Sequence, residues 1–247
     1  MRIRPTSLLT LLLLVFAGPA SAAPADSLSF APPPSLVSKG DVALAVAASF
    51  GILMVTHLDD NLSHEVPESN SAFARHVAFG AEKAGNPLYL APLLGATWLA
   101  GHVSGHHGLS SSALRIAGGI AASAALSTGL KVVAGRSRPN ETPDDIDEFR
   151  AFSGHTAFPS GHTTVAFSLA SGIDQETSAR WVPYVVYPLA GLVGWSRLRD
   201  NRHWTSDVIA GALVGTWTTR KFQRMMRGGQ SLSLGVTPGA ATVTYRF

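Results

Sequence analysis

A series of apolar segments, separated by polar stretches of which residues 56–87 form the longest, follows along most of the chain. They cover residues 42–55, 88–103, 114–133, 163–173, 182–195 and 208–219. Several contain Gly, Ser or Thr, and most are short for membrane spans of roughly 20 residues. They would serve equally well as the core helices of a soluble bundle. The pattern predicts a helical chain and leaves open whether its helices lie in a membrane.

The composition narrows the class of protein. Of the 247 residues, 46% are hydrophobic and only 14% are charged, so the chain can build a core and is not intrinsically disordered. The formal net charge of +3 gives no reason to expect a nucleic acid as partner. The chain has no cysteine, which excludes disulfide scaffolds, thiolate metal sites and cysteine nucleophiles. The 24 glycines favour apolar helices that pack tightly or lie in a membrane.

The N-terminus has the pattern of a secretory signal peptide. Arg2 and Arg4 precede an apolar run over residues 8–17, and Ala20-Ser21-Ala22 forms a cleavage site of the A-x-A type. The run is too short to span a bilayer comfortably, although an uncleaved anchor is the alternative. We therefore expect a signal peptide at 1–22, a Pro- and Ser-rich linker at 23–40, and export to a bacterial cell envelope, the periplasm.

The C-terminus departs from the helical pattern. Apolar and polar residues alternate over residues 231–236 and again over 242–247, which is the period of a β-strand. Between them, Thr237-Pro238-Gly239-Ala240 places Pro and Gly where a type II turn requires them. We expect a small β-hairpin at 228–247 that packs on a helical domain covering 41–227.

Two clusters of polar residues that could bind or react with a ligand occur before residue 165. Lys131 and Arg138 are seven residues apart, about two helical turns, so they can share one helix face that ends before Pro139. Further on, Ser160 and Gly161 precede His162 and an apolar run. Free backbone N–H groups at such a helix start can bind an anion. A Ser N-cap beside an incidental His would give the same sequence.

A third cluster begins at Ser196 and Arg197 and ends in a histidine–carboxylate pair. His203 and Asp207 are spaced i, i+4, so they would be neighbours on one helix face. A carboxylate on one ring nitrogen fixes the tautomer and frees the other nitrogen to act as nucleophile or base. An exposed ion pair of little energetic value is the alternative.

Taken together, the clusters spell K-x6-R-P, P-S-G-H and S-R-x5-H-x3-D, in that order, over about a third of the chain. This resembles the type 2 phosphatidic acid phosphatase (PAP2) family, which shares its core with vanadium haloperoxidases and bacterial class A acid phosphatases. The resemblance implies an all-α bundle with the site at its centre. It implies no cofactor and no metal, because basic residues neutralise the phosphoryl group.

The resemblance also assigns roles to individual residues. His203 would attack phosphorus and form a phosphohistidine, Asp207 would orient it, and His162 would protonate the leaving oxygen and then activate water. The phosphoryl oxygens would be held by a set of basic and small residues: Lys131, Arg138, Ser160, Gly161 and Arg197.

The expected function is that of a metal-independent phosphatase of the cell envelope, acting on phosphate monoesters or diphosphates. The glycine-rich apolar helices favour a lipid substrate and membrane association. The alternatives are a soluble periplasmic acid phosphatase of broad specificity, a vanadium-dependent haloperoxidase and a non-catalytic envelope protein. The short chain and Asp207 argue against the haloperoxidase, and the intact motifs argue against a non-catalytic protein. The pattern names neither the specific substrate nor the oligomeric state.

A repeat of the second motif, a histidine cluster and an acidic stretch do not by themselves predict a functional site. Ser153-Gly154-His155-Thr156 repeats the second motif without its proline, and we interpret it as a loop near the site with no catalytic role. His102, His106 and His107 have no carboxylate nearby, which argues against a metal site. The acidic stretch over residues 141–148 is interpreted as a solvated loop, with a lid over the cationic site as the alternative.

Overall fold

The computed structural model describes residues 38–57, 59, 71–141, 149–227, 231–237 and 240–246. The expected signal peptide, residues 142–148 of the acidic loop and the two central residues of the expected type II turn lie outside these ranges. The chain divides into two units, residues 1–41 and 42–247. The second unit contains all three of the polar motifs.

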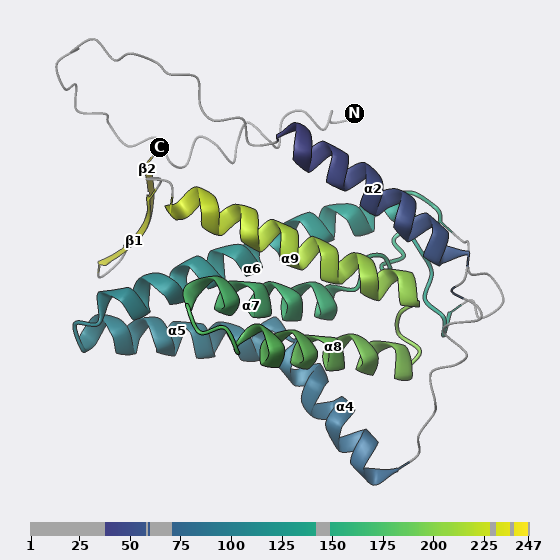
Figure 1. Ribbon diagram of the computed structural model, residues 1–247, viewed down its shortest axis with the longest axis horizontal. Coiled ribbons are helices and arrows are strands. Elements are labelled where there is room, and N and C mark those ends of the chain that lie inside the picture. Colours follow the sequence, from purple (N-terminus) through teal and green to yellow (C-terminus); the bar gives the residue numbers. More distant parts are fainter. Residues whose placement is uncertain are drawn as a thin grey trace, which may run out of the picture. The chain divides into compact units, whose positions relative to one another are not determined.

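The chain is helical, as the apolar segments predicted (Figure 1). The helices are α2 (Lys39–Thr56), α4 (Ala72–Ala84), α5 (Pro87–Val103), α6 (His107–Ala134), α7 (Gly161–Glu176), α8 (Pro183–Arg199) and α9 (Thr205–Arg227). The prediction of an all-α bundle is confirmed. Near the C-terminus, β1 (Ser231–Thr237) and β2 (Ala240–Arg246) pair antiparallel, with Ser231 opposite Arg246 and Thr237 opposite Ala240.

Helix α4 lies in a polar stretch for which the sequence pattern predicted no helix. Ser71 caps it, because the Ser71 hydroxyl accepts a hydrogen bond from the backbone N–H of Ala74 at 3.1 Å. Its buried residues are Ala74 and Ala78, while Phe73 and Phe79 are exposed. The segment is amphipathic but only weakly hydrophobic on average, so a search for continuous apolar segments did not find it.

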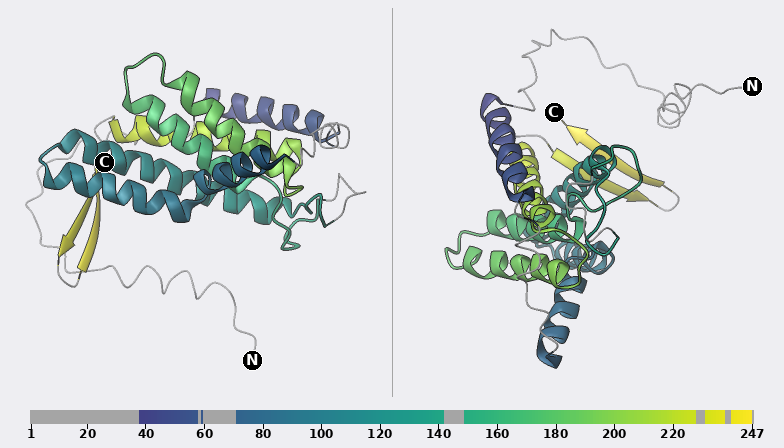
Figure 2. Two further views of the ribbon diagram at one scale, coloured as in Figure 1. Left: turned by 90° about the horizontal axis from the view of Figure 1, so that it is seen from below. Right: turned by 90° about the vertical axis from the view of Figure 1, so that its right-hand side faces the viewer.

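Helix α7 is the centre of the bundle, since it packs against α6, α8 and α9 (Figures 1 and 2). The close approach of α7 and α9 depends on glycine. A Cβ atom on Gly211 would lie 2.6 Å from the carbonyl oxygen of Ser160, and one on Gly215 would lie 2.3 Å from that of Thr164. Because glycine has no Cβ atom, the two helix backbones can approach this closely. The contact holds the first turns of α7 against α9.

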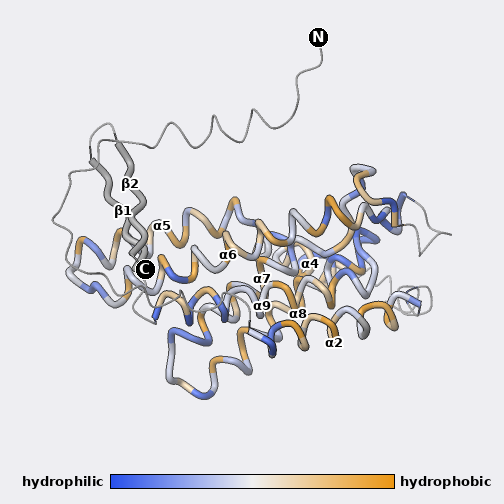
Figure 3. The backbone as a smooth tube through the Cα atoms, turned by 90° about the horizontal axis from the view of Figure 1, so that it is seen from above, coloured by the Kyte–Doolittle hydropathy of each residue, from blue (hydrophilic) through white to orange (hydrophobic). Residues whose placement is uncertain are grey.

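The interior contains many small and hydroxyl-bearing residues beside a few large apolar ones, while many other large apolar residues are exposed. Ser123, Thr163, Thr164, Ser168 and Thr219 are fully buried. The exposed large residues occur on α5, α6 and α8 among other helices, and include Leu88, Leu93, Leu99, Val133, Tyr184 and Leu189. Hydrophobic colouring accordingly runs along the helices in Figure 3. By length and composition, α2 and α6 are each able to cross a membrane.

Candidate active site

The candidate site lies where the C-terminal ends of α6 and α8 meet the N-terminal ends of α7 and α9. The backbone N–H of Ser160 donates to the carbonyl oxygen of Asp207 at 2.9 Å, which joins the starts of α7 and α9. The indole N–H of Trp204 donates to the carbonyl oxygen of Ser137 at 3.1 Å, which joins the segment after α6 to the segment before α9. Three motifs that are far apart in the sequence are thereby brought together.

Lys131 and Arg138 do not share a helix face, so that prediction is wrong. Helix α6 ends at Ala134, because Gly135 adopts the left-handed conformation with φ of 55°. A Cβ atom at Gly135 would lie 1.8 Å from the carbonyl oxygen of Arg150, so only glycine fits this turn. The helix therefore ends before Pro139 can act on it, and Arg138 follows in a loop.

Lys131 and Arg138 nevertheless both donate hydrogen bonds to the same residue, Thr156. The Nζ atom of Lys131 donates to the carbonyl oxygens of Thr156 at 2.6 Å and Pro159 at 2.5 Å. An Nη atom of Arg138 donates to the hydroxyl of the same Thr156 at 3.2 Å. Thr156 belongs to the repeat of the second motif, and this is the structural role of that repeat. Its His155 lies 3.3 Å from a carboxylate oxygen of Glu141.

The second motif forms the first turn of α7. Ser160 occupies the N-cap position, is fully buried and accepts a hydrogen bond from the hydroxyl of Thr163 at 3.0 Å, but makes no side-chain cap bond. The Cε atom of Lys131 lies 3.7 Å from the position of a Cβ atom on Gly161. The Nε2 atom of His162 is buried and has no hydrogen-bond partner among the described residues. A buried ring nitrogen without a protein partner is available to a ligand.

His203 and Asp207 lie side by side, but not on one helix as predicted. Helix α9 begins at Thr205, so His203 precedes it and Asp207 lies in its first turn. The Nδ1 atom of His203 is 3.5 Å from Oδ2 of Asp207, and the two side chains are only 5% and 0% exposed. The pair is therefore not an exposed ion pair. The distance is long for a hydrogen bond, as is common in catalytic pairs without substrate.

The surroundings favour the neutral form of His203. Burial lowers the pKa of the His203 imidazole below its ordinary value, and the neighbouring Asp207 carboxylate opposes this effect. Lys131 and Arg138 also act to lower this pKa. A neutral imidazole whose Nδ1 faces a carboxylate presents its Nε2 lone pair to an incoming electrophile.

Arg197 occupies the last turn of α8 and is 5% exposed. One of its Nη atoms lies 3.2 Å from Asp200 and 3.7 Å from Glu82, and its Nε donates to Ser196 at 3.2 Å. The structure thus places two carboxylates, both partly exposed, beside this cation. A phosphate group with more negative charge can compete for it, since Arg binds such groups bidentately.

Two buried residues at the site were missed by sequence reasoning. Arg136 is 1% exposed and forms ion pairs of 2.9 Å with both Asp207 and Asp59. Arg136 lies inside the first motif, so a third basic residue between Lys131 and Arg138 was the available signal. Asp59 lies in a polar stretch remote from every motif, and nothing in the pattern distinguished it from its acidic neighbours.

The remaining candidate features lie apart from these contacts. His102 stacks on Trp98 with ring centroids 5.4 Å apart, and the Nδ1 of His106 is 2.9 Å from the hydroxyl of Ser104. Among the residues that the structure describes, no three His, Asp or Glu side chains form a group that could hold a metal ion. The eight residues predicted for the site therefore gather in one place, and the histidine cluster does not join them.

Comparisons with known proteins agree with this geometry. Residues 112–227 match the model of the PAP2 superfamily. The chain is 29% identical over 231 residues to a Lipid A 1-phosphatase of Porphyromonas gingivalis, covering 85% of this chain and 48% of that protein. It is 32% identical over 121 residues to Lipid phosphate phosphatase 1 of Arabidopsis thaliana, covering 37% of each chain.

The chain thus spans less than half the length of these curated relatives. A solved structure, a transmembrane PAP2 type phosphatidylglycerolphosphate phosphatase from Bacillus subtilis, has the same fold with a TM-score of 0.58. It is 17% identical, and the match covers 75% of this chain and 97% of that one. All three sequence motifs lie inside residues 112–227, the part of this chain that matches the PAP2 superfamily model.

Proposed function

We propose that this protein is a metal-independent phosphatase that hydrolyses phosphate monoesters or diphosphates carried by a lipid. One observation carries the proposal: a buried His203 is backed by Asp207, and Lys131 and Arg138 act on its imidazole, while Arg197 acts on the neighbouring His162. Phosphoryl transfer depends on neutralising charge and on in-line positioning, and this arrangement supplies both. The family match and the relatives named as lipid phosphatases support the same reaction class.

In the first step, the Nε2 lone pair of His203 attacks phosphorus. A P–N bond forms as the bond from phosphorus to the leaving oxygen breaks, and His162 gives that oxygen its proton. Asp207 stabilises the positive charge that develops on the imidazole of His203. The cationic side chains neutralise the phosphoryl oxygens as they move into the plane of the transition state.

In the second step, a water molecule attacks phosphorus on the phosphohistidine. His162 accepts a proton from the water, the P–N bond breaks, and inorganic phosphate leaves. The same residue can serve both steps, because loss of its proton to the leaving oxygen prepares it to act as the base. The Nε2 atom of His162 has no protein partner among the described residues, which suits this exchange.

The distribution of side-chain size supports a membrane setting for the bundle. A soluble bundle would bury its large apolar residues, whereas here fully buried positions include many Ser and Thr while Leu88, Leu93 and Tyr184 are 78%, 60% and 81% exposed. Large apolar residues exposed on several helices are typical of a membrane protein, and small residues at helix contacts are typical of its interior. Export through the predicted signal peptide remains part of this proposal.

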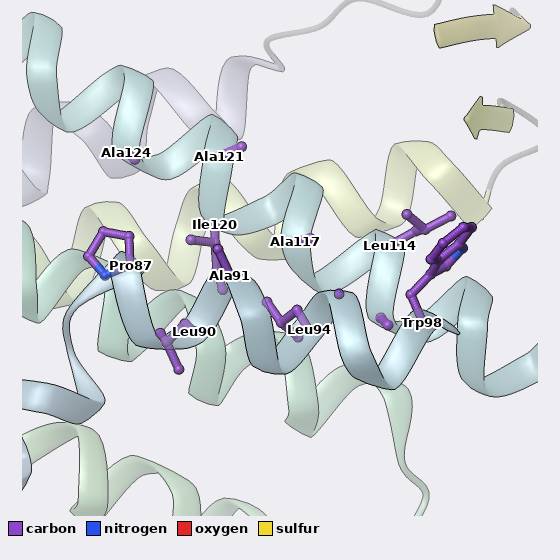
Figure 4. Close-up of a pocket in the computed structure, with 12 residues that line it drawn as sticks. Pro87, Leu90, Ala91, Leu94, Trp98, Leu114, Ala117, Ile120, Ala121 and Ala124 are labelled. Atoms are coloured by element: carbon purple, nitrogen blue, oxygen red, sulfur yellow. The ribbon is translucent and has the colours of Figure 1, made fainter. Parts of the chain in front are cut away.

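An apolar cleft beside the site supports a lipid substrate (Figure 4). It has a volume of about 460 Å³ and lies between α5 and α6, with Pro87 and Ala124 toward one end and Trp98 and Leu114 toward the other. The first end is close to the site, because Gly85 lies against His162, with only 3.0 Å from a Cβ position on Gly85 to the His162 carbonyl oxygen. A cleft with this lining can hold part of an acyl chain while the phosphate lies among the cations.

The test is phosphate release by the full chain, purified in detergent and offered lipid phosphates beside small soluble esters. We expect His203→Ala to abolish turnover and Asp207→Asn to lower kcat by about 10²- to 10⁴-fold through loss of the correct tautomer. His155→Ala is the matched control, since it removes the histidine of the repeated motif and should retain activity. Acid-labile phosphate should be trapped on His203 during turnover.

Full activity of the His203→Ala variant would overturn the mechanism. Recovery of the protein in the soluble periplasmic fraction, with a preference for small esters over lipid phosphates, would instead make it a soluble acid phosphatase. N-terminal sequencing of the exported protein tests the predicted cleavage after Ala22.

A further inference from the structure

The carboxylate behind His203 is itself held by a buried arginine. One Nη atom of Arg136 donates to Oδ1 of Asp207 at 2.9 Å, while the backbone N–H of Trp204 donates to Oδ2 at 2.9 Å. Both carboxylate oxygens thus accept a hydrogen bond from a group other than His203. The Asp207 carboxylate can rotate only by breaking one of these bonds, and in its present orientation Oδ2 faces the Nδ1 atom of His203.

The same arginine is paired on its other side with a second carboxylate. Its second Nη atom donates to Oδ2 of Asp59 at 2.9 Å, and all three ionic side chains are 1% exposed or less. Ser206 closes the network, because its backbone N–H donates to Oδ1 of Asp59 at 2.8 Å and its hydroxyl donates to Oδ2 at 2.5 Å. The Arg136 carbon Cζ also lies 4.8 Å and 5.4 Å from the ring centroids of Phe149 and Trp204.

The charge state of Asp59 follows from its partners. Burial raises the pKa of this carboxyl above its ordinary value, and the hydrogen bonds from Ser206 and Arg136 oppose this effect without cancelling it. Three donors point at its two oxygens, and a protonated carboxyl would need an acceptor in place of one of them. Two carboxylates share one guanidinium, so these three side chains together carry one excess negative charge next to His203 whenever both carboxylates are ionised.

A purely structural role does not account well for this arrangement. Burying an ion pair costs several kcal/mol per ion in desolvation, and such pairs are often neutral or worse for stability than apolar replacements. A cluster with an unbalanced charge is still less favourable in isolation. It becomes favourable when a positive charge develops on the adjacent imidazole, which is what attack by His203 on phosphorus produces.

We propose that Arg136 and Asp59 are positioning residues for the His203 nucleophile, acting through Asp207. This inference rests on the proposed function in one respect, namely that His203 is the nucleophile. Arg136 orients the Asp207 carboxylate. Asp59 offsets the positive charge of Arg136, which would otherwise weaken the attraction of Asp207 for the charged imidazole.

The two residues should shift the titration of His203 in opposite directions. Removing the positive charge with Arg136→Gln favours the protonated imidazole, so the acid limb of kcat/KM should move to higher pH. Removing the negative charge with Asp59→Asn disfavours it, so the acid limb should move to lower pH. The other titratable or charged groups that act on His203 are Asp207, Lys131, Arg138 and His162, which both variants leave in place.

The experiment combines kinetics on a soluble phosphate ester with a direct NMR titration of His203 labelled with 15N, in detergent. We expect kcat to fall about 10- to 100-fold in each variant, as for other groups that orient a reacting ligand, with KM changed less than about twofold. Arg136→Lys retains the positive charge but cannot donate from two separate nitrogen atoms to Asp207 and Asp59. It should keep the acid limb near its original pH while kcat falls, and this variant remains informative if Arg136→Gln does not fold.

Acid limbs that move in the same direction in Arg136→Gln and Asp59→Asn, or that do not move, would overturn the inference. So would losses of kcat that simply follow a fall in Tm. If the unmodified chain releases no phosphate from any ester, the proposed function fails. The NMR titration then still reports whether Arg136 and Asp59 control the ionisation of His203.

Discussion

The crossing of α7 and α9 leaves no room for a methyl group at Gly215, and this makes a sharp prediction. In a Gly215→Ala variant, the new Cβ atom would lie 2.3 Å from the carbonyl oxygen of Thr164 and 3.0 Å from the backbone nitrogen of Ser168. Both are backbone atoms of α7, so no side-chain rotation can relieve the contact. Helix α9 must move away from α7 by about 1 Å to restore an ordinary van der Waals distance.

The magnitude follows from two opposing effects. Overpacking in a tight interior costs about 1 to 3 kcal/mol, whereas replacing Gly by Ala within a helix contributes about 1 kcal/mol of stability. We expect a net destabilisation of up to about 2 kcal/mol, which lowers Tm by up to about 8 °C for a chain of this size. The effect on activity should be larger, because the bond between Ser160 and Asp207 spans the same helix contact and a 1 Å displacement can cost about 10²-fold in rate.

The assays are thermal unfolding in detergent and phosphate release, with Gly129→Ala as the matched control. Gly129 also lies within a helix, but nothing lies within 4 Å of its Cβ position. This control should keep full activity and gain up to about 1 kcal/mol in stability. If Gly215→Ala behaved like Gly129→Ala in both assays, the close contact of α7 and α9 and its role in placing the site would be refuted.

Three further predictions concern the site and its scaffold. Because burial lowers the pKa of His203 below 6.5, the nucleophile stays neutral as pH falls through that value. The acid limb of the pH profile of kcat/KM should therefore lie below pH 6.5. An acid limb above pH 6.5 would contradict the proposed environment of His203. Vanadate should inhibit as a mimic of the five-coordinate transition state, while EDTA should leave the rate unchanged; a loss with EDTA that a divalent ion restores would contradict the metal-independent mechanism. Gly135→Ala should lower the free energy of unfolding by about 2 kcal/mol or more, because it places a side chain in a left-handed turn against Arg150. A Tm within about 1 °C of the unmodified chain corresponds to a change of only a few tenths of a kcal/mol, and it would contradict this turn.

The helices were predictable because apolar segments of helical length are separated by polar stretches. The same reasoning missed α4, whose packed face is made of alanines, and it placed the end of α6 at Pro139. A proline is a stronger signal in sequence than a glycine, yet Gly135 ends the helix first by adopting a positive φ. Whether a particular glycine takes that conformation depends on its tertiary neighbours, here Arg150.

The residues of the candidate site were predictable because their spacing matches three motifs that a family shares. Their geometry was less so. His203 and Asp207 have helical spacing, but α9 begins between them, and no local signal fixes a helix start to within two residues. Asp59 could not have been selected at all, since its importance arises from a contact with Arg136 across 77 positions of the chain.

The way the cations are held before substrate binds explains how a cluster of partly buried positive charges can be stable. Lys131 is bonded to the carbonyl oxygens of Thr156 and Pro159, and Arg197 lies beside Asp200 and Glu82. A phosphate that enters must replace these partners, so its binding free energy is a difference between two sets of interactions. Neutral carbonyls and partly exposed carboxylates compete weakly with a group carrying two negative charges. The site is therefore suited to discriminate a terminal phosphate, with its two charges, from a phosphodiester that carries one.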